Sequence, residues 1–164
     1  MAWRLPSFHA NVSKRLIKTP KLHFADTGLV CYLLGIRSPE QLRDHPLRGA
    51  IFETWVASEI LKSRTHRGLP PSLSFYRDRK GAEVDVIVDL GRELLAVETK
   101  SGETVAEDFF SGLRTLESVV ASSRLRRKVR ASIVYGGSEA QQRTSVTVVP
   151  WSRLDKCSWW SQGE

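Results

Sequence analysis

Acidic and basic side chains with the spacing of a metal site occur in two neighbouring stretches of the sequence. Asp85 lies in residues 83–90, and Glu98 and Lys100 lie two positions apart in residues 93–100. Carboxylate oxygens are the ligands that Mg²⁺ and Mn²⁺ prefer. Such a metal could polarise a phosphodiester and activate a water, while the lysine positions that water or neutralises developing charge. The three side chains therefore indicate metal-dependent hydrolysis.

The two stretches that carry these residues have the patterns of β-strands. Residues 83–90 alternate with a period of two, which predicts a strand with an apolar face formed by Val84, Val86, Val88 and Leu90. Residues 93–100 form a second apolar run of strand length. Between them, Gly91-Arg92 suits a two-residue type II′ turn with glycine at its first central position. The sequence therefore predicts a β-hairpin.

The short turn fixes how the two strands pair. It sets Leu90 opposite Glu93, and the same register sets Asp85 opposite Glu98. Cβ atoms of opposed residues lie roughly 4.5–5.5 Å apart, so two carboxylates in this arrangement repel each other. A divalent cation between them would reverse the sign of the interaction. We expect Asp85 and Glu98 to bind Mg²⁺ or Mn²⁺ on one face of the sheet, with Lys100 beside them.

A plainer interpretation of the charged hairpin stays open. Asp85 could instead pair with Lys100 or with an arginine on a solvated sheet face. A basic turn, Arg77, Arg79 and Lys80, leads into the hairpin. These three side chains could contact nucleic-acid phosphates, or they could be an ordinary charged turn.

Length and composition favour one folded domain with a polyanionic partner. The 164 residues are 41% hydrophobic and 26% charged, values typical of a globular domain. No apolar run approaches the ~20 residues that a membrane span needs, so we expect no contact with a membrane. Cys31 and Cys157 lack a metal-binding spacing, which favours the reducing cytoplasm. A net charge of +7 favours nucleic acid as the partner, DNA before RNA.

The elements around the hairpin predict an α/β fold. Their order is one helix, three strands joined by short turns, a second helix that a Thr104–Glu107 capping box begins, and two more strands. The strand–helix–strand step should make its two strands parallel. We expect a mixed sheet with a helix on either side, built from helices at about 47–64 and 104–122 and strands at 73–76, 83–90, 93–100, 131–135 and 146–149.

The chain divides by composition into three parts. Residues 1–47 are a basic N-terminal segment with short helices, one capped by Asp26 or Thr27 and one begun by Ser38-Pro39. Residues 48–150 are the core domain, and residues 151–164 are a tryptophan-rich tail.

An acidic residue on one strand followed by acid-x-lysine on the next resembles the PD-(D/E)xK nuclease superfamily, which has the restriction-endonuclease-like fold. The resemblance implies that Asp85 and Glu98 are metal ligands, that Lys100 is the catalytic lysine, and that Glu53 on the first core helix completes the site. Val84 replaces the proline that gives the motif its name.

A narrower resemblance covers residues 14–149. It is to a nuclease-like domain of unknown function at the C-terminus of bacterial and archaeal predicted AAA-type ATPases, and it is carried by residues 18–29, 49–60, 76–77, 83–85 and 97–101. It implies an ATPase module as a partner, with residues 1–47 as the linker. The sequence itself contains no phosphate-binding G-x-x-x-x-G-K-[ST] loop.

Two hypotheses about function follow. The first is a metal-dependent nuclease that cleaves phosphodiester bonds in DNA as the C-terminal part of an ATPase. The second is a non-catalytic module that binds nucleic acid or regulates the ATPase.

Overall fold

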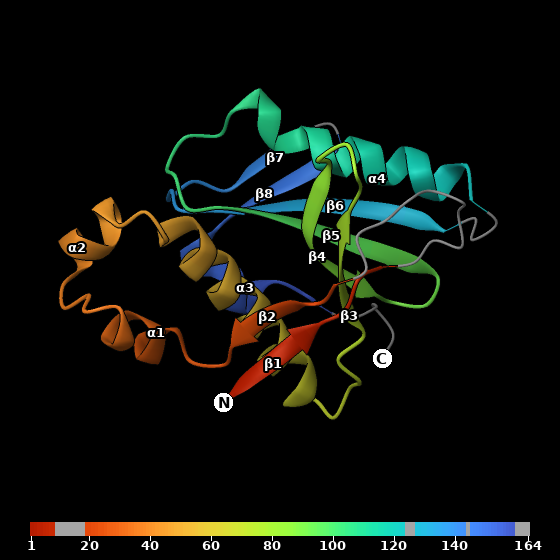
Figure 1. The fold of residues 1–164 in the computed structure, drawn as a ribbon. Coiled ribbons are helices and arrows are strands. Elements are labelled where there is room, and N and C mark those ends of the chain that lie inside the picture. Colours follow the sequence, from red (N-terminus) through yellow and green to blue (C-terminus); the bar gives the residue numbers. More distant parts are fainter. Residues whose placement is uncertain (9–18, 124–126, 144, 160–164) are drawn as a thin grey trace.

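A six-stranded mixed sheet forms the centre of the molecule (Figure 1). The structure, a computed structural model, describes residues 1–8, 19–123, 127–143 and 145–159. β3–β4, β4–β5 and β7–β8 are antiparallel, whereas β5–β6 and β6–β8 are parallel. In spatial order the strands are β3 (Leu73–Arg77), β4 (Glu83–Asp89), β5 (Glu93–Lys100), β6 (Lys128–Tyr135), β8 (Val146–Pro150) and β7 (Gln141–Arg143).

One long helix covers each face of this sheet (Figure 1). α3 (Arg48–Thr65) packs Val56 and Ile60 against the strands on one side. α4 (Ser111–Ala121) packs Leu113 and Leu116 on the other side. The two apolar cores are therefore separated by the sheet, as in other three-layer α/β domains.

The N-terminal residues form a small hairpin that packs against α3. β1 (Ala2–Leu5) pairs with β2 (Lys21–Phe24). Leu5 is fully buried in the α3-side core, and Phe75 of β3 bonds to the chain just after β1, through Pro6 O at 2.9 Å. The hairpin is thus fixed to both α3 and the sheet edge.

Two short helices lie beyond the hairpin, at the end of α3 (Figure 1). They are α1 (Thr27–Leu33) and α2 (Pro39–Asp44). Asp26 caps α1 by accepting a bond from Leu29 N, and Ser38 caps α2 by accepting one from Gln41 N, so both predicted caps are confirmed. Among the described residues, no helix is long and apolar enough to cross a membrane.

The predicted fold class is confirmed, and so is the order of the core elements. β4 and β5 pair in the predicted register, Val86 with Val97 and Val88 with Leu95, and β5 is parallel to β6. Gly91 in the turn has a φ of 76°, which glycine adopts readily.

The predicted start of the second helix is wrong. Residues 107–110 form a 3₁₀ turn, and α4 begins only at Ser111, without a side-chain cap. Just after this start, Gly112 lies directly against the backbone of Glu83. β1 and β7 were not predicted either, since neither shows a clear alternation.

The described residues that follow β8 contribute to the α3-side core. Residues Trp151–Lys156 form a 3₁₀ helix, and Leu154 and Trp159 are buried.

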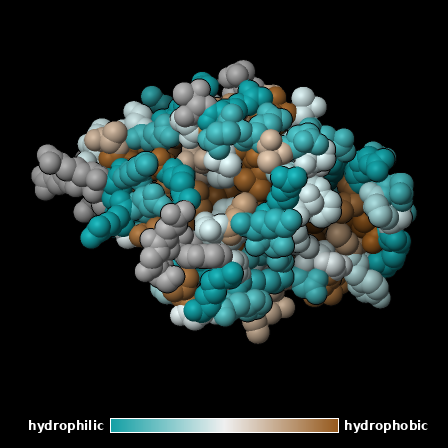
Figure 2. All heavy atoms as spheres, turned by 180° about the vertical axis from the view of Figure 1, so that it is seen from behind, coloured by the Kyte–Doolittle hydropathy of each residue, from teal (hydrophilic) through white to brown (hydrophobic). Residues whose placement is uncertain are grey.

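On the face opposite to that of Figure 1, hydrophilic side chains predominate and hydrophobic ones show as smaller areas between them (Figure 2).

Candidate metal centre

An irregularity in β4 determines where Asp85 points. Tyr76 pairs with Val84 and Ser74 pairs with Ile87, so two residues of β4 oppose one residue of β3. This is the geometry of a β-bulge, which turns the strand and redirects a side chain. Val84 consequently packs on the α4 side with Ile87, although Val86 and Val88 pack on the α3 side.

The bulge corrects the predicted single apolar face of residues 83–90. Strict alternation would have left Val84 and Val86 on one side and Asp85 on the other. Instead Asp85 lies on the α3 side, where its Oδ1 is 3.4 Å from Lys21 Nζ. Its other oxygen, Oδ2, accepts bonds from the Thr99 N–H (2.9 Å) and hydroxyl (2.8 Å) on β5. The carboxylate is buried and fixed between the two strands.

The ammonium group of Lys21 lies among three carboxylates from separate elements. It is 2.6 Å from Glu53 Oε1 on α3, 2.6 Å from Glu83 Oε1 on β4, and next to Asp85. Burial lowers the pKa of Lys21, but the carboxylates outweigh it and hold the pKa above its ordinary value. Lys21 is therefore a charged, mostly buried member of the site.

The pKa values of two carboxylates around Lys21 are shifted in opposite directions. Burial and the charge of Asp85 raise the pKa of Glu53, despite the opposing effect of Lys21. Burial also raises the pKa of Glu83, yet its bonds from Lys21 and Arg77 outweigh burial and leave the pKa below its usual value. Glu83 is thus held as a carboxylate between two cations.

Glu98 and Lys100 lie together on the other side of β5. They follow Leu94 and Ala96 in the strand alternation, and these two residues pack on the α4 side. The Lys100 ammonium is 3.0 Å from Glu98 Oε1 and 5.2 Å from the centre of the Phe109 ring. The expectation that Asp85, Glu98 and Lys100 share one regular face is therefore wrong, because the bulge rotates Asp85 to the α3 side.

Asp85 and Glu98 nevertheless interact electrostatically. Burial, followed by the charge of Asp85, raises the pKa of Glu98 to about 8, and Lys100 offsets this only in part. Glu98 Oε2 is buried and accepts no hydrogen bond from the described residues. A buried carboxylate oxygen that accepts no hydrogen bond, in a group that a second carboxylate repels, is an unfavourable arrangement unless a cation offsets the charge.

These donors fit Mg²⁺ or Mn²⁺ in their chemistry, since all are carboxylate oxygens. In the described part of the chain, however, no three His, Cys, Asp or Glu side chains are arranged to hold a metal ion. The carboxylates are instead spaced around an ammonium. Glu53, Glu83 and Asp85 each place an oxygen 2.6–3.4 Å from Lys21 Nζ, whereas Mg²⁺ needs oxygen ligands at the shorter distance of ~2.0–2.1 Å.

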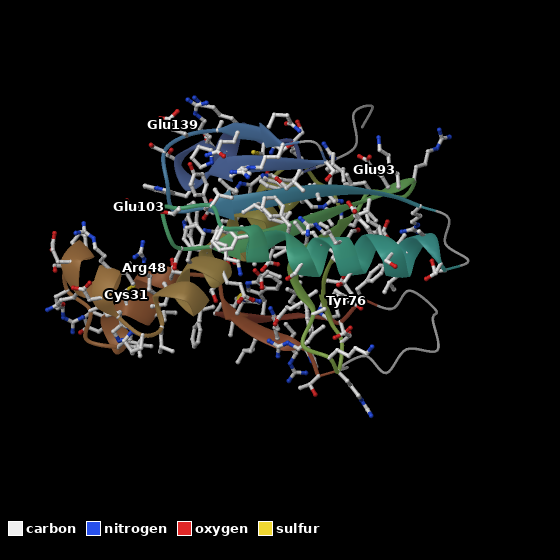
Figure 3. The ribbon with its side chains drawn as sticks, turned by 90° about the horizontal axis from the view of Figure 1, so that it is seen from above. Cys31, Arg48, Tyr76, Glu93, Glu103 and Glu139 are labelled. Atoms are coloured by element: carbon white, nitrogen blue, oxygen red, sulfur yellow. The ribbon has the colours of Figure 1, made fainter. Side chains whose placement is uncertain are left out.

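The start of α3 is tied to the end of β5, which keeps Glu53 near the strand that carries Glu98. Arg48, labelled in Figure 3, donates to the backbone oxygen of Ser101, one residue beyond β5. On the opposite side of the sheet, Tyr76, also labelled there, is buried in the α4-side core. The Arg48 bond thus supports the α3 side of the site, and buried packing supports the other side.

The basic turn divides into two kinds of residue. Arg77 donates two bonds to Glu83 Oε2, at 2.8 and 2.6 Å, so it holds the carboxylate in place. Arg79 and Lys80 are exposed in the turn between β3 and β4. Arg77 is therefore engaged by Glu83, whereas the side chains of Arg79 and Lys80 are exposed to solvent, as side chains that contact phosphates need to be.

Reasoning from sequence missed Lys21 and Thr99. Lys21 lies in a short strand whose pattern is inverted, since polar Lys21 and His23 face inward and apolar Leu22 and Phe24 face outward. An inverted pattern of this kind indicates that polar groups are needed inside, and it could have identified Lys21 as a candidate site residue. Thr99 had no signal, because only the bulge brings Asp85 to it.

Comparison with known families and proteins gives the chain's relationships. Residues 1–40 match a family described as Domain of unknown function (DUF8612). The chain is 30% identical over 134 residues to Uncharacterized protein Mb2031c of Mycobacterium bovis and to Uncharacterized protein Rv2008c of Mycobacterium tuberculosis. The match covers 82% of this chain but 28% of each relative, so the chain spans less than a third of their length. No solved structure matches. Residues 48–154 match the family described as Domain of unknown function (DUF4143), and the chain therefore belongs to that family.

Proposed function

We propose that this chain is a nuclease domain of the PD-(D/E)xK type that cleaves phosphodiester bonds in DNA and depends on a divalent cation. The observation that carries the proposal is the buried Asp85–Glu98 pair, with the pKa of Glu98 raised to about 8 and its Oε2 unbonded within the described residues. A sheet selected only for stability avoids two interacting buried carboxylates.

Asp85, Glu98 and Glu53 are the residues that would hold Mg²⁺ or Mn²⁺. Bound there, the cation would polarise a phosphate oxygen and make water a better nucleophile. Thr99 keeps Asp85 in one orientation through its two bonds. Lys100 is one-third exposed, so its ammonium can approach a substrate phosphate while it stays near Glu98. The chain itself thus supplies orientation and positive charge.

DNA is the substrate that the charge of the chain supports. The net charge is +7 although the site is acidic, so the positive charge lies elsewhere on the molecule. Arg79 and Lys80 extend from the turn next to β4 and would contact phosphates beside the site. RNA offers the same phosphates, so substrate assays have to compare both.

The second candidate, a non-catalytic module of an AAA-type ATPase, is favoured by a different observation. α1 buries none of its residues, and apolar side chains on it and at its C-cap are well exposed, namely Leu29, Tyr32, Leu33 and Leu34. Exposed apolar residues that gather in one place suit contact with another protein domain. A further domain is consistent with the greater length of the mycobacterial relatives. Cys31 and Cys157 are free thiols, which suits a location in the cytoplasm.

Cleavage of supercoiled plasmid with Mn²⁺ or Mg²⁺ tests the first candidate. We expect the parent to nick the plasmid, and the variants Asp85→Ala, Glu98→Ala and Lys100→Ala to lose at least ~100-fold in rate. Glu59→Gln is the matched control, since Glu59 lies on α3 and pairs with Lys62 at the surface. Circular dichroism establishes that each variant is folded.

Different results separate the two candidates. If the parent cleaves neither DNA nor RNA with either metal, the nuclease proposal is wrong. Salt-dependent DNA binding that persists in the three alanine variants would then support the non-catalytic module. Cleavage that survives Asp85→Ala would equally contradict the site assignment.

A further inference from the structure

Lys21 differs from an ordinary surface lysine in how strongly it is fixed. Its side chain is 15% exposed, against 46% for Lys62, and it contacts three carboxylates at once. The ammonium is also 5.2 Å from the centre of the Phe75 ring. A lysine with these surroundings has given up most of its hydration in exchange for the carboxylates.

The backbone that carries Lys21 is anchored independently of these ion pairs. His23, two residues along β2, is buried, contacts the Thr54 hydroxyl at 3.1 Å and stacks on Trp3 at 5.0 Å. Ser58 of α3 donates to Phe24 O at 3.1 Å. The strand would therefore stay on α3 if the Lys21 ammonium left the carboxylates.

The position of the ammonium coincides with the position that a metal would need. Glu53 and Asp85 are two of the proposed ligands, and both point at Lys21 Nζ. An ammonium and a divalent cation cannot share these oxygens, because two cations at such short separation repel strongly.

We propose that the Lys21 ammonium is a resident cation of the carboxylate site and that a divalent cation binds there by displacing it. The inference rests on the metal site of the proposed function and adds a regulatory element to it. While Lys21 is in place, its ammonium offsets part of the negative charge of Glu53, Glu83 and Asp85 and stabilises the domain without metal. The affinity for metal is then set by competition with a side chain of the same molecule.

Replacing Lys21 by methionine tests the competition. Methionine keeps the length of the apolar stem and removes the charge. Isothermal titration with Mn²⁺ should show that Lys21→Met binds about tenfold more tightly, or better, than the parent, because the competing charge is gone. Lys62→Met is the matched control on the exposed Glu59 pair and should bind as the parent does.

Thermal unfolding gives a second readout on the same proteins. Without metal, Lys21→Met should be less stable than the parent, since Glu53, Glu83 and Asp85 lose the cation that they share. Saturating Mn²⁺ should raise its melting temperature more than that of the parent. Equal or weaker Mn²⁺ binding by Lys21→Met would overturn the proposal.

A measurement on the unmodified chain covers the case in which Lys21→Met does not fold. Acetylation by an amine-reactive reagent, followed by mass spectrometry, reports the accessibility of each lysine. Lys21 should be protected without metal and should react several-fold faster with saturating Mn²⁺, whereas Lys62 should not change. No rise in Lys21 reactivity would overturn the proposal in that case.

The results distinguish this inference from the proposed function. If Lys21→Met binds Mn²⁺ more tightly but no form cleaves DNA, the nuclease proposal fails and the role of Lys21 stands. If the parent cleaves DNA with Mn²⁺ while Lys21→Met binds no more tightly, the nuclease proposal stands and the role of Lys21 fails.

Discussion

Thr99 donates two hydrogen bonds to Oδ2 of Asp85, one from its backbone N–H at 2.9 Å and one from its hydroxyl at 2.8 Å. The ladder between β4 and β5 includes Val86 and Val97, and next to this pair the Asp85 side chain bridges the two strands. The carboxylate therefore has a structural role in joining the strands as well as a place in the proposed metal site.

Replacing Thr99 by valine removes the hydroxyl and keeps the shape of the side chain. Because the lost bond goes to a carboxylate that stays buried, we expect a loss of about 1.5–3 kcal/mol in the free energy of unfolding. Urea denaturation measures this loss. Thr99→Ser keeps the hydroxyl and should retain most of the stability. Equal stability of the valine and serine variants would show that the bond contributes little.

Gly112 lets α4 approach the strand that carries Glu83. A Cβ atom at this position would lie 1.8 Å from the backbone oxygen of Glu83, so Gly112→Ala must push the helix away from β4. We expect a destabilisation of about 3 kcal/mol or more, since rigid backbone cannot relax as a side chain would. Gly49→Ala on α3 is the control, because a Cβ there meets nothing within 4 Å and alanine favours helix. A stable Gly112→Ala protein would contradict this close packing.

Arg64 joins α3 to the C-terminal part of the described chain. It is 2% exposed, and it donates to Pro70 O at 3.0 Å and to Trp159 O at 2.6 Å. The two bonds come from separate nitrogens of the guanidinium group, and the single nitrogen of a lysine cannot take both positions, so Arg64→Lys should destabilise the domain by about 2–4 kcal/mol. The exposed Arg67, mutated to lysine, should leave the denaturation midpoint unchanged. A similarly small effect at Arg64 would mean that its bonds are replaced by water.

Local signals explain why the sheet could be predicted from the sequence. Alternating residues in β4 and a two-residue turn at Gly91 are sufficient to fix the strand register. The caps Asp26 and Ser38 act within a few residues and were recognised for the same reason.

The arrangement of the site depends on contacts between distant residues. Lys21 is 32 residues from Glu53 and 64 from Asp85 in sequence, and only the packing of the β1–β2 hairpin brings it there. The bulge at Asp85, where two residues of β4 oppose one residue of β3, leaves no mark in the sequence, because Val84, Val86 and Val88 alternate as in a regular strand. Because of these two features, the site residues lie on two sides of the sheet and not on the single face that the sequence predicts.

The stability of the metal-free protein should fall as the pH rises toward 8. The folded-state pKa of Glu98 is about 8, raised by burial and by Asp85, while the unfolded value is near 4.5. Between these values the folded protein holds a proton that the unfolded chain has released. Each pH unit of increase therefore lowers the free energy of unfolding by at most about 1.4 kcal/mol. Burial and Lys21 lower the pKa of His23 from 6.5 to about 4, so the effect of His23 on stability lies mainly below pH 6.5 and fades above it.

Urea denaturation in EDTA between pH 6.5 and 8 therefore isolates Glu98. Glu98→Gln cannot ionise, and its stability should be nearly flat across this window, whereas Glu59→Gln at the exposed α3 position should keep the slope of the parent. Parallel slopes for the parent and Glu98→Gln would show that the Glu98 carboxyl ionises normally. In that case Asp85 and Glu98 would not be the repelling pair on which the proposed metal site depends, because burial and repulsion between the two carboxylates would raise the pKa of Glu98.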